Sequence, residues 1–186
     1  MSRAAGLRRI VSGGQTGVDR AALDAALQHG FPCGGWCPRG RWAEDGPIPA
    51  RYPLREADST DPAWRTEANI RDSDATAIIA VGPLTGGTRL TDELARRLGR
   101  PLCLVDASDT DIDRMVDQLM DFLAEHAVAV LNVAGPRRSQ APAMEDLAGR
   151  IIGGLLERLG QADSRKLEVS AARDSMGAEQ DVPRQR

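Results

Sequence analysis

Two short loops of the chain combine glycines with hydroxyl side chains, each between an apolar run and a helix-like run. The first loop reads SGGQTG at residues 12–17, and the second reads GPLTGGT at residues 82–88. Glycine lets backbone N–H groups reach an anion, because no Cβ intervenes, and it permits the positive φ angles of tight loops. Neither loop is a GxGxxG fingerprint or a P-loop. Together they predict a phosphate site.

A third loop, AGPRRS at residues 134–139, adds Arg137 and Arg138. All three loops follow runs that resemble buried strands. Ligands of parallel sheets bind beyond the carboxyl ends of the strands, where the N-termini of helices carry partial positive charge. One glycine loop alone is more often a structural turn, but three loops at corresponding places favour an anion site to which both arginines contribute.

The segment from residue 37 to residue 61 is too long for an ordinary connection and contains four prolines without a sustained period. Arg39 and Arg41 either contact a ligand or pair with the nearby acids Glu44 and Asp45. Two tryptophans, at positions 36 and 42, either stack on a flat ligand or pack the loop down.

The predicted helix after Asp61 carries Arg65 and Asn69 on one face, with Asp72 next in line. This polar stripe either lines the pocket or faces solvent, and we favour the pocket. The residues predicted to contact the ligand are Ser12, Gly13, Gly14, Gln15, Thr16, Gly17, Arg20, Arg39, Arg41, Arg65, Asn69, Gly86, Gly87, Thr88 and Arg137. We expect Gly14→Val to weaken ligand binding and to leave the fold intact.

Strand-like and helix-like runs must position these loops, and they alternate along the chain. The predicted strands are 8–13, 32–36, 75–82, 101–106 and 127–133, and the predicted helices are 18–29, 62–71, 89–99, 110–126 and 143–159. Thr110 and Asp113 resemble a capping box for the fourth helix. The strands are continuous apolar runs, which is typical of parallel sheets covered on both faces. The sequence therefore predicts an α/β fold: a Rossmann-like parallel sheet of about five or more strands with helices on both faces.

The composition indicates one globular domain. The chain has 186 residues, of which 41% are apolar and 27% are charged. We assign residues 1–160 to a ligand-binding domain and residues 161–186 to a polar tail that is expected to be mobile. The net charge of −3 argues against nucleic-acid binding. No apolar run approaches a membrane span or a signal peptide, so we expect a cytoplasmic protein without a membrane partner.

Five ordered motifs resemble the molybdenum cofactor carrier family. They are IVSGGQTGVDRAALDAAL, GGWCPRGRWAEDGPIPARYPL, RTEANIRDSDATAII, GGTRLT and LNVAGPR, and they span residues 10 to about 159. That family belongs to a Rossmann-like superfamily with the LOG-type phosphoribohydrolases and the DNA-processing protein DprA. The resemblance implies a homo-oligomer that carries molybdenum cofactor, a phosphate-bearing pterin with a molybdenum-oxo centre. A molybdoenzyme or a cofactor-synthesis protein would be its partner.

Two other functions stay open. LOG-type phosphoribohydrolases, which release the base of a nucleoside monophosphate, use a PGGxGTxxE pattern. Here GGTRLTDE lacks the second glycine-threonine step and moves the acid to Asp92 or Glu93. A nucleotide-sensing module would share the same loops. We therefore favour a binding protein over an enzyme and assign no catalytic residue.

The sequence predicts no structural metal. Cys33, Cys37 and Cys103 cannot all pair with one another, and the CxxxC spacing of the first two is not the usual zinc spacing. We expect structural or free thiols. A magnesium ion bound by Asp19, Asp72 or Asp74 together with a phosphate remains a minor alternative.

Overall fold

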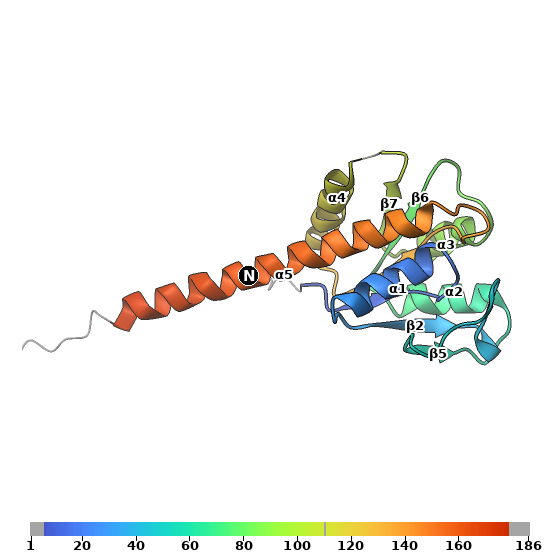
Figure 1. The fold of residues 1–186 in the computed structure, drawn as a ribbon, viewed down its shortest axis with the longest axis horizontal. Helices are drawn as coiled ribbons and strands as arrows, with labels where there is room; N and C mark the ends of the chain where they lie inside the picture. The colour runs from blue at the N-terminus through green and yellow to red at the C-terminus, as the bar shows by residue number, and fades with distance from the viewer. Residues whose placement is uncertain (1–5, 110, 179–186) are drawn as a thin grey trace, which may run out of the picture.

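The computed structural model describes residues 6–109 and 111–178, and it has an α/β fold (Figure 1). Six parallel strands form the main sheet. In spatial order they are β5 (Leu54–Glu56), β2 (Cys33–Cys37), β1 (Arg9–Val11), β8 (Val130–Ala134), β6 (Ala75–Ala80) and β7 (Leu102–Asp106). The predicted Rossmann-like parallel sheet is confirmed.

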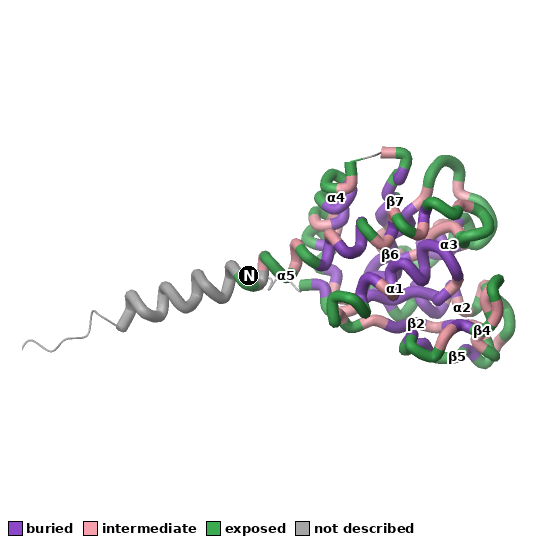
Figure 2. The backbone as a smooth tube through the Cα atoms, viewed as in Figure 1, coloured by how far each residue is buried: buried purple, intermediate pink, exposed green. Residues whose placement is uncertain are grey.

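Helices cover both faces of this sheet. On one face α1 (Val18–Gln28) and α4 (Ile112–Glu125) pack against α5 (Met144–Ala178), and on the other α2 (Pro62–Arg71) packs against α3 (Gly86–Arg97). The face of α1 toward the sheet consists of buried alanines, which lets this helix lie close to the strands. Figure 2 shows the buried backbone concentrated in the strands and in the inner sides of these helices.

The segment predicted as one irregular loop contains four short elements. They are the 3-10 turn η1 (Arg39–Arg41), the antiparallel pair β3 (Trp42–Ala43) and β4 (Gly46–Pro47), and the edge strand β5. These strands have two or three residues each, too few to show a period. Strand β5 buries only Leu54, so its pairing with β2 leaves no apolar run in the sequence.

Three helix ends differ from the prediction, and the first is the start of α3, which begins at Gly86 instead of residue 89. The side chain of Asp111 caps α4 by accepting from the N–H of Arg114 at 3.1 Å, and the predicted cap, Thr110, lies outside the described residues. Helix α5 continues to Ala178 instead of ending at residue 159. No proline lies between that point and Ala178, and a single glycine at position 160 costs only about 1 kcal/mol and does not end a helix.

The distal part of α5 extends away from the α/β domain (Figure 1), and the predicted mobility of residues 161–186 stays a prediction. We expect deletion of residues 162–186 to change the Tm by less than about 4 °C, because this polar segment has no aromatic residues. Differential scanning calorimetry of the full and shortened chains measures the change. A larger fall would show that the tail packs on the domain.

Candidate functional site

A cleft of about 350 Å³ lies at the carboxyl edge of the sheet. The ends of β1, β8 and β6 meet there, so the three predicted loops converge as the parallel topology requires. The cleft is lined by Gly13, Gln15 and Asp19 of the first loop and α1, by Trp42 to Glu44 of the β3–β4 pair, and by residues of α2, α3 and the third loop. The arrangement brings backbone donors, charges and one aromatic ring to a single small cavity.

The N-terminus of α3 forms one wall of the cleft. Thr85 occupies the N-cap position without a side-chain cap hydrogen bond. Among the described residues, no protein acceptor pairs with the N–H groups of Gly86, Gly87 and Thr88. The side chains of Thr88 and Thr91 are buried, and Thr91 donates its hydroxyl hydrogen to the carbonyl of Gly87 at 2.9 Å. Free donors at the positive end of a helix are suited to an anion.

Gly13, Asp19 and Arg65 form the opposite wall. Arg65 Nη1 donates to the carbonyl of Gly13 at 3.2 Å, and Arg65 Nε is buried without a partner among the described residues. Asp19 is 7% exposed, and its Oδ2 accepts from the N–H of Gln15 at 3.3 Å. Burial raises the pKa of Asp19, and the nearby Arg65 charge opposes that shift. This wall has charged groups whose hydrogen-bonding capacity the protein does not use fully.

The turn between β3 and β4 is fastened to the other loops by Glu44. Its carboxylate accepts from the hydroxyl of Thr16 and from the hydroxyl and N–H of Ser139, the last at 3.1 Å. Arg137 Nε lies 3.9 Å away. Hydrogen bonds from Ser139 and Thr16 lower the pKa of Glu44. One carboxylate therefore connects all three segments beside the cleft.

Asp45 provides a second attachment. It accepts two hydrogen bonds from Arg20, at 2.5 and 2.8 Å, and Arg20 Nε also donates to the carbonyl of Gly14 at 3.1 Å. The hydrogen bond from Arg20 lowers the pKa of Asp45. The two attachments hold Trp42, a residue that is 60% exposed, beside the cleft. Such a ring is available to stack on a flat ligand.

We expect Glu44→Gln to lower the free energy of unfolding at pH 7 by about 1 kcal/mol, after allowance for solvent screening. Because the folded-state pKa of Glu44 lies below its ordinary value of 4.5, its contribution is present above that pH and is lost as the pH falls through the folded value. Urea denaturation between pH 3 and pH 7 measures both effects. Glu93→Gln, in an exposed pair with Arg89, is the control and should change little; equal losses would refute the attachment.

The structure brings together part of the predicted site. The predicted residues that line the cleft are Gly13, Gln15, Arg65, Asn69, Gly87, Thr88 and Arg137. Two of these side chains serve the protein itself. Gln15 Oε1 accepts from the N–H groups of Thr16 and Glu44, both at 3.0 Å. Asn69 pairs with both backbone polar groups of Trp36. Their contacts with a ligand stay predictions.

Other predicted residues lie outside the cleft lining and support it. Ser12 donates its hydroxyl hydrogen to the carbonyl of Val133 at 2.8 Å. Thr16 binds Glu44 and Arg20 binds Asp45 in the turn between β3 and β4. Gly14 and Gly17 pack against neighbouring loops. Gly86 is the first residue of α3, and a Cβ added there would lie 3.3 Å from Gln140 Nε2.

The two arginines of η1 are also outside the cleft lining. Arg41 donates to the carbonyls of Ile48, Pro49, Tyr52 and Leu54. It therefore fills neither of its two predicted roles: its guanidinium shapes the loop. Arg39 is exposed.

Trp36, unlike Trp42, is used for packing. Its Nε1 donates to Asp72 at 2.8 Å, and its ring meets Trp64 edge to face at 5.6 Å. The expectation that Arg138 attracts an anion is not met, because its guanidinium makes two hydrogen bonds to Glu145, at 2.5 and 2.6 Å.

Sequence reasoning missed several lining residues. Asp19 was considered only as a magnesium ligand, and Thr91, Asn132 and Gln140 were not considered. The available signal for Asp19 was its place in the first turn of the helix after the glycine loop. The side chain of Asn132, inside β8, donates to Thr76 at 3.3 Å, and an isolated amide in an apolar strand gives no comparable signal.

The described residues include no cluster of His, Cys, Asp or Glu that could hold a metal ion. Cys33, Cys37 and Cys103 are free, as predicted, and burial raises the pKa of Cys103 to about 11. Asp74 accepts from the N–H groups of Ala129 and Val130, which is a structural role.

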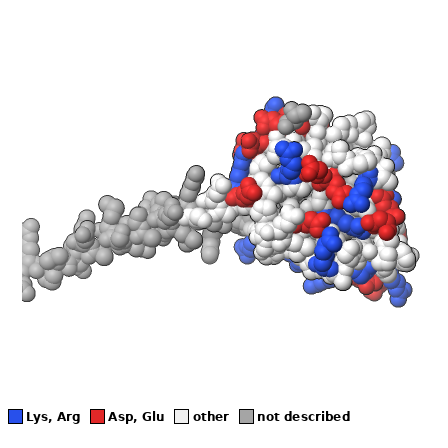
Figure 3. All heavy atoms as spheres, viewed as in Figure 1, with Lys and Arg blue, Asp and Glu red and all other residues white. Residues whose placement is uncertain are grey.

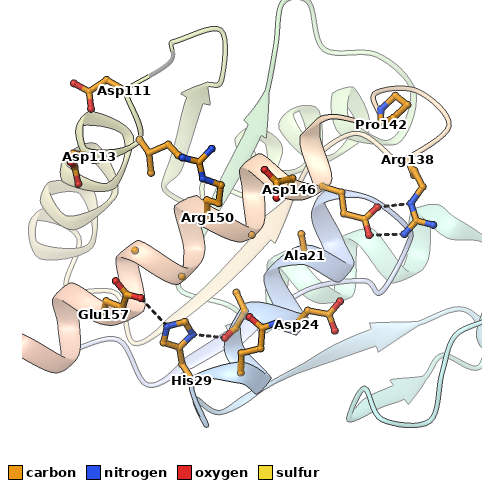
Figure 4. Close-up of a pocket in the computed structure, with 17 residues that line it drawn as sticks. Ala21, Asp24, His29, Asp111, Asp113, Arg138, Pro142, Asp146, Arg150 and Glu157 are labelled. Carbon is orange, nitrogen blue, oxygen red and sulfur yellow. Dashed lines mark hydrogen bonds and ion pairs between the residues drawn. The ribbon is translucent and has the colours of Figure 1, made fainter.

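A larger groove of about 1220 Å³ lies on the outer side of α1, α4 and α5 (Figure 4). Glycines and alanines make up five of its lining residues, and four of its charged groups form two pairs: His29 lies 3.6 Å from Glu157, and Arg138 binds Glu145. Because it is remote from the strand ends and offers few free donors, we place the ligand site in the smaller cleft.

On the face in Figure 3, acidic and basic side chains are intermixed without a continuous basic patch.

The acids that follow the second loop do not reach the cleft. Asp92 pairs with Arg96 and Glu93 with Arg89 on the outer side of α3. Neither lines the cleft.

None of the described helices has both the length and the apolar character of a membrane span.

Fold and cleft together define a Rossmann-like protein with a small-molecule cavity at the carboxyl edge of its sheet. The model of the circularly permutated YpsA SLOG family, cpYpsA, matches residues 10–156, and the chain belongs to this family. A crystal structure of a putative molybdenum carrier protein from Syntrophus aciditrophicus SB is 39% identical, with a TM-score of 0.79, over 82% of this chain and 96% of that one. The resemblance inferred from the motifs is confirmed. No functionally curated protein matches the chain.

Proposed function

We propose that this protein binds a small phosphate-bearing molecule in the cleft and that its cargo is molybdenum cofactor. The observation that carries the proposal is the convergence of the uncapped N-terminus of α3, the cations Arg65 and Arg137 and the exposed ring of Trp42 on one cavity. The name of the structural relative from Syntrophus supports the choice of cargo.

The residues of the cleft fit the chemistry of such a cargo. Gly87 and Thr88 would hold the phosphate through their N–H groups, Thr88 would add its hydroxyl as a further donor, and Trp42 would cover the flat pterin. The volume of about 350 Å³ lies at the lower end of the range for small-molecule sites, about 300 to 1,000 Å³.

A carrier must bind its cargo without breaking a bond in it. The acids after the second loop point away from the cleft, which favours a carrier over a base-releasing enzyme. A cytoplasmic location, homo-oligomerisation and delivery to a molybdoenzyme or a cofactor-synthesis protein belong to the same proposal.

Native mass spectrometry of protein purified without oxygen tests the proposal. We expect a bound mass equal to that of molybdenum cofactor or its pterin, and the same spectrum gives the oligomeric state. Protein that is free of ligand and takes up neither this cofactor nor a nucleotide would contradict the proposed function. A nucleotide in place of a pterin would favour the sensing module.

We expect Thr88→Val to weaken binding of guanosine monophosphate by about 1.5 to 3 kcal/mol, the range for a hydrogen bond to a charged group. Thr85→Val is the control, because Thr85 is exposed and outside the cleft lining. Titration calorimetry measures both. Equal affinities of Thr88→Val and the unchanged protein would exclude a contact between the Thr88 hydroxyl and the phosphate.

A further inference from the structure

The cleft contains a buried carboxylate that the proposed phosphate site does not use. Asp19 lines the cavity and is 7% exposed. A carboxylate offers about four lone-pair directions on two oxygens. The N–H of Gln15 occupies one of them, at a long 3.3 Å, and the N–H of Gly13 and the hydroxyl of Ser12 also interact with this carboxylate. Asp19 therefore retains acceptor capacity.

The other acid beside the cleft cannot serve in the same way. Both oxygens of Glu44 already accept hydrogen bonds from Thr16 and Ser139. The neighbouring amides Asn69 and Gln15 are likewise occupied by backbone groups. Of the two acids that line the described cleft, Asp19 has one hydrogen bond within normal geometry and Glu44 has three, so Asp19 retains more acceptor capacity.

Gly13 leaves Asp19 open to the cavity. A Cβ at position 13 would lie 2.9 Å from Asp19 Oδ2 and 2.8 Å from Arg65 Cζ, so it would stand between these two groups. Arg65 also provides a positive charge beside the acid. Burying a carboxylate is costly unless hydrogen bonds compensate, and a ligand with two adjacent donors would supply them.

We propose that Asp19 recognises the 2-amino-4-oxopyrimidine edge shared by pterins and guanine, an inference that rests on the proposed function. That edge presents a ring N–H and an exocyclic NH₂ side by side, which match the two oxygens of one carboxylate. The corresponding edge of adenine presents a ring nitrogen acceptor, which a carboxylate repels. Asp19 thus selects the ring system, and the α3 wall holds the phosphate that all such ligands share.

Titration calorimetry with three nucleoside monophosphates tests this assignment. Guanosine monophosphate should bind at least about tenfold more tightly than adenosine monophosphate, because a buried polar group left unpaired discriminates strongly. Inosine monophosphate lacks only the 2-amino group and should lose most of the advantage. Equal affinities for all three would overturn the role of Asp19 and leave the phosphate site standing.

The variant Asp19→Asn supplies the second test. It should lower the affinity for guanosine monophosphate about tenfold or more and that for adenosine monophosphate by less than about threefold. Asp72→Asn, outside the cleft lining, is the control, and circular dichroism monitors folding. An equal loss for both nucleotides would refute selective recognition. Failure of the unchanged protein to bind any of the three nucleotides or the pterin would overturn the proposed function and this inference with it.

Discussion

Gly17→Ala should lower the free energy of unfolding by about 2 to 4 kcal/mol, a large part of the stability of a domain of this size. Gly17 has φ +79°, and a Cβ there would lie 2.5 Å from the carbonyl oxygen of Pro136 and 2.8 Å from the nitrogen of Arg138. With ψ −133°, Gly17 lies in a backbone region that costs a non-glycine residue about 1 to 3 kcal/mol, and displacement of packed backbone adds about 1 kcal/mol. Urea denaturation followed by circular dichroism measures the loss.

Gly30→Ala measures the cost of a positive φ where there is no close contact. Gly30 also has a positive φ, +60°, but nothing lies within 4 Å of a Cβ placed there. We expect it to lose only about 1 kcal/mol. If the two variants lose the same amount, the close approach of the first and third loops contributes nothing.

This close approach matters because it fixes the cleft. The carbonyl of Pro136 accepts from the N–H of Val18 at 3.3 Å, and the N–H of Arg138 donates to Thr16 Oγ1 at 3.1 Å. The same hydroxyl group of Thr16 contacts Glu44. Gly17 thus lets the first and third loops approach closely enough for Thr16 to contact both Arg138 and Glu44, next to the strand that contains Trp42.

The long elements of the fold were predictable because their patterns are local. Strand β6 and helices α1 and α2 have apolar runs or faces, and Asp61 begins α2 as its capping residue. Strand β5 has no such pattern: it exists because β2 provides hydrogen-bonding partners from a distant part of the chain. The sequence does not indicate the far end of α5, because the segment after residue 160 is polar and predicts a mobile tail.

The site was predictable only as a set of loops. Glycines and arginines in the sequence identify where an anion could bind, but their direction depends on contacts between segments. Arg65 faces the cavity, whereas the guanidinium of Arg41 shapes its own loop. Likewise, the role of Glu44 depends on Ser139, which is 95 positions away. Asp19 lies beside the cleft because the buried first turn of α1 follows the glycine loop directly.

Gly13 and Gly14 are adjacent in the sequence, but the sequence does not show which groups a side chain at each position would contact. We expected Gly14→Val to block the ligand and spare the fold. Gly14 has φ +74°, and its Cβ would overlap Leu54 Cδ1 and lie 3.3 Å from Ile48 Cδ1. The added side chain would enter the small core under the β3–β4 segment, so this variant should lose stability. The ligand test therefore moves to Gly13.

Gly13→Val should reduce the affinity for guanosine monophosphate by about 100-fold or more, which is about 2.7 kcal/mol, and should keep the protein folded. Position 13 lacks a positive φ, and its Cβ would lie 2.8 Å from Arg65 Cζ and 2.9 Å from Asp19 Oδ2, in two side chains that line the cavity. The valine and the displaced guanidinium would then occupy the space of the ligand. Titration calorimetry measures the affinity, and urea denaturation measures the stability.

Gly14→Val completes the comparison, because it adds the same side chain one position along. We expect it to lose about 2 kcal/mol or more of stability from backbone strain and overpacking. Its remaining folded fraction should bind the nucleotide within about threefold of the unchanged protein, since Gly14 does not line the cleft. The reverse pattern, with Gly13→Val binding normally and Gly14→Val folded but unable to bind, would place the ligand on the side of Leu54 and Ile48. It would exclude the cleft between α2 and α3 as the binding site.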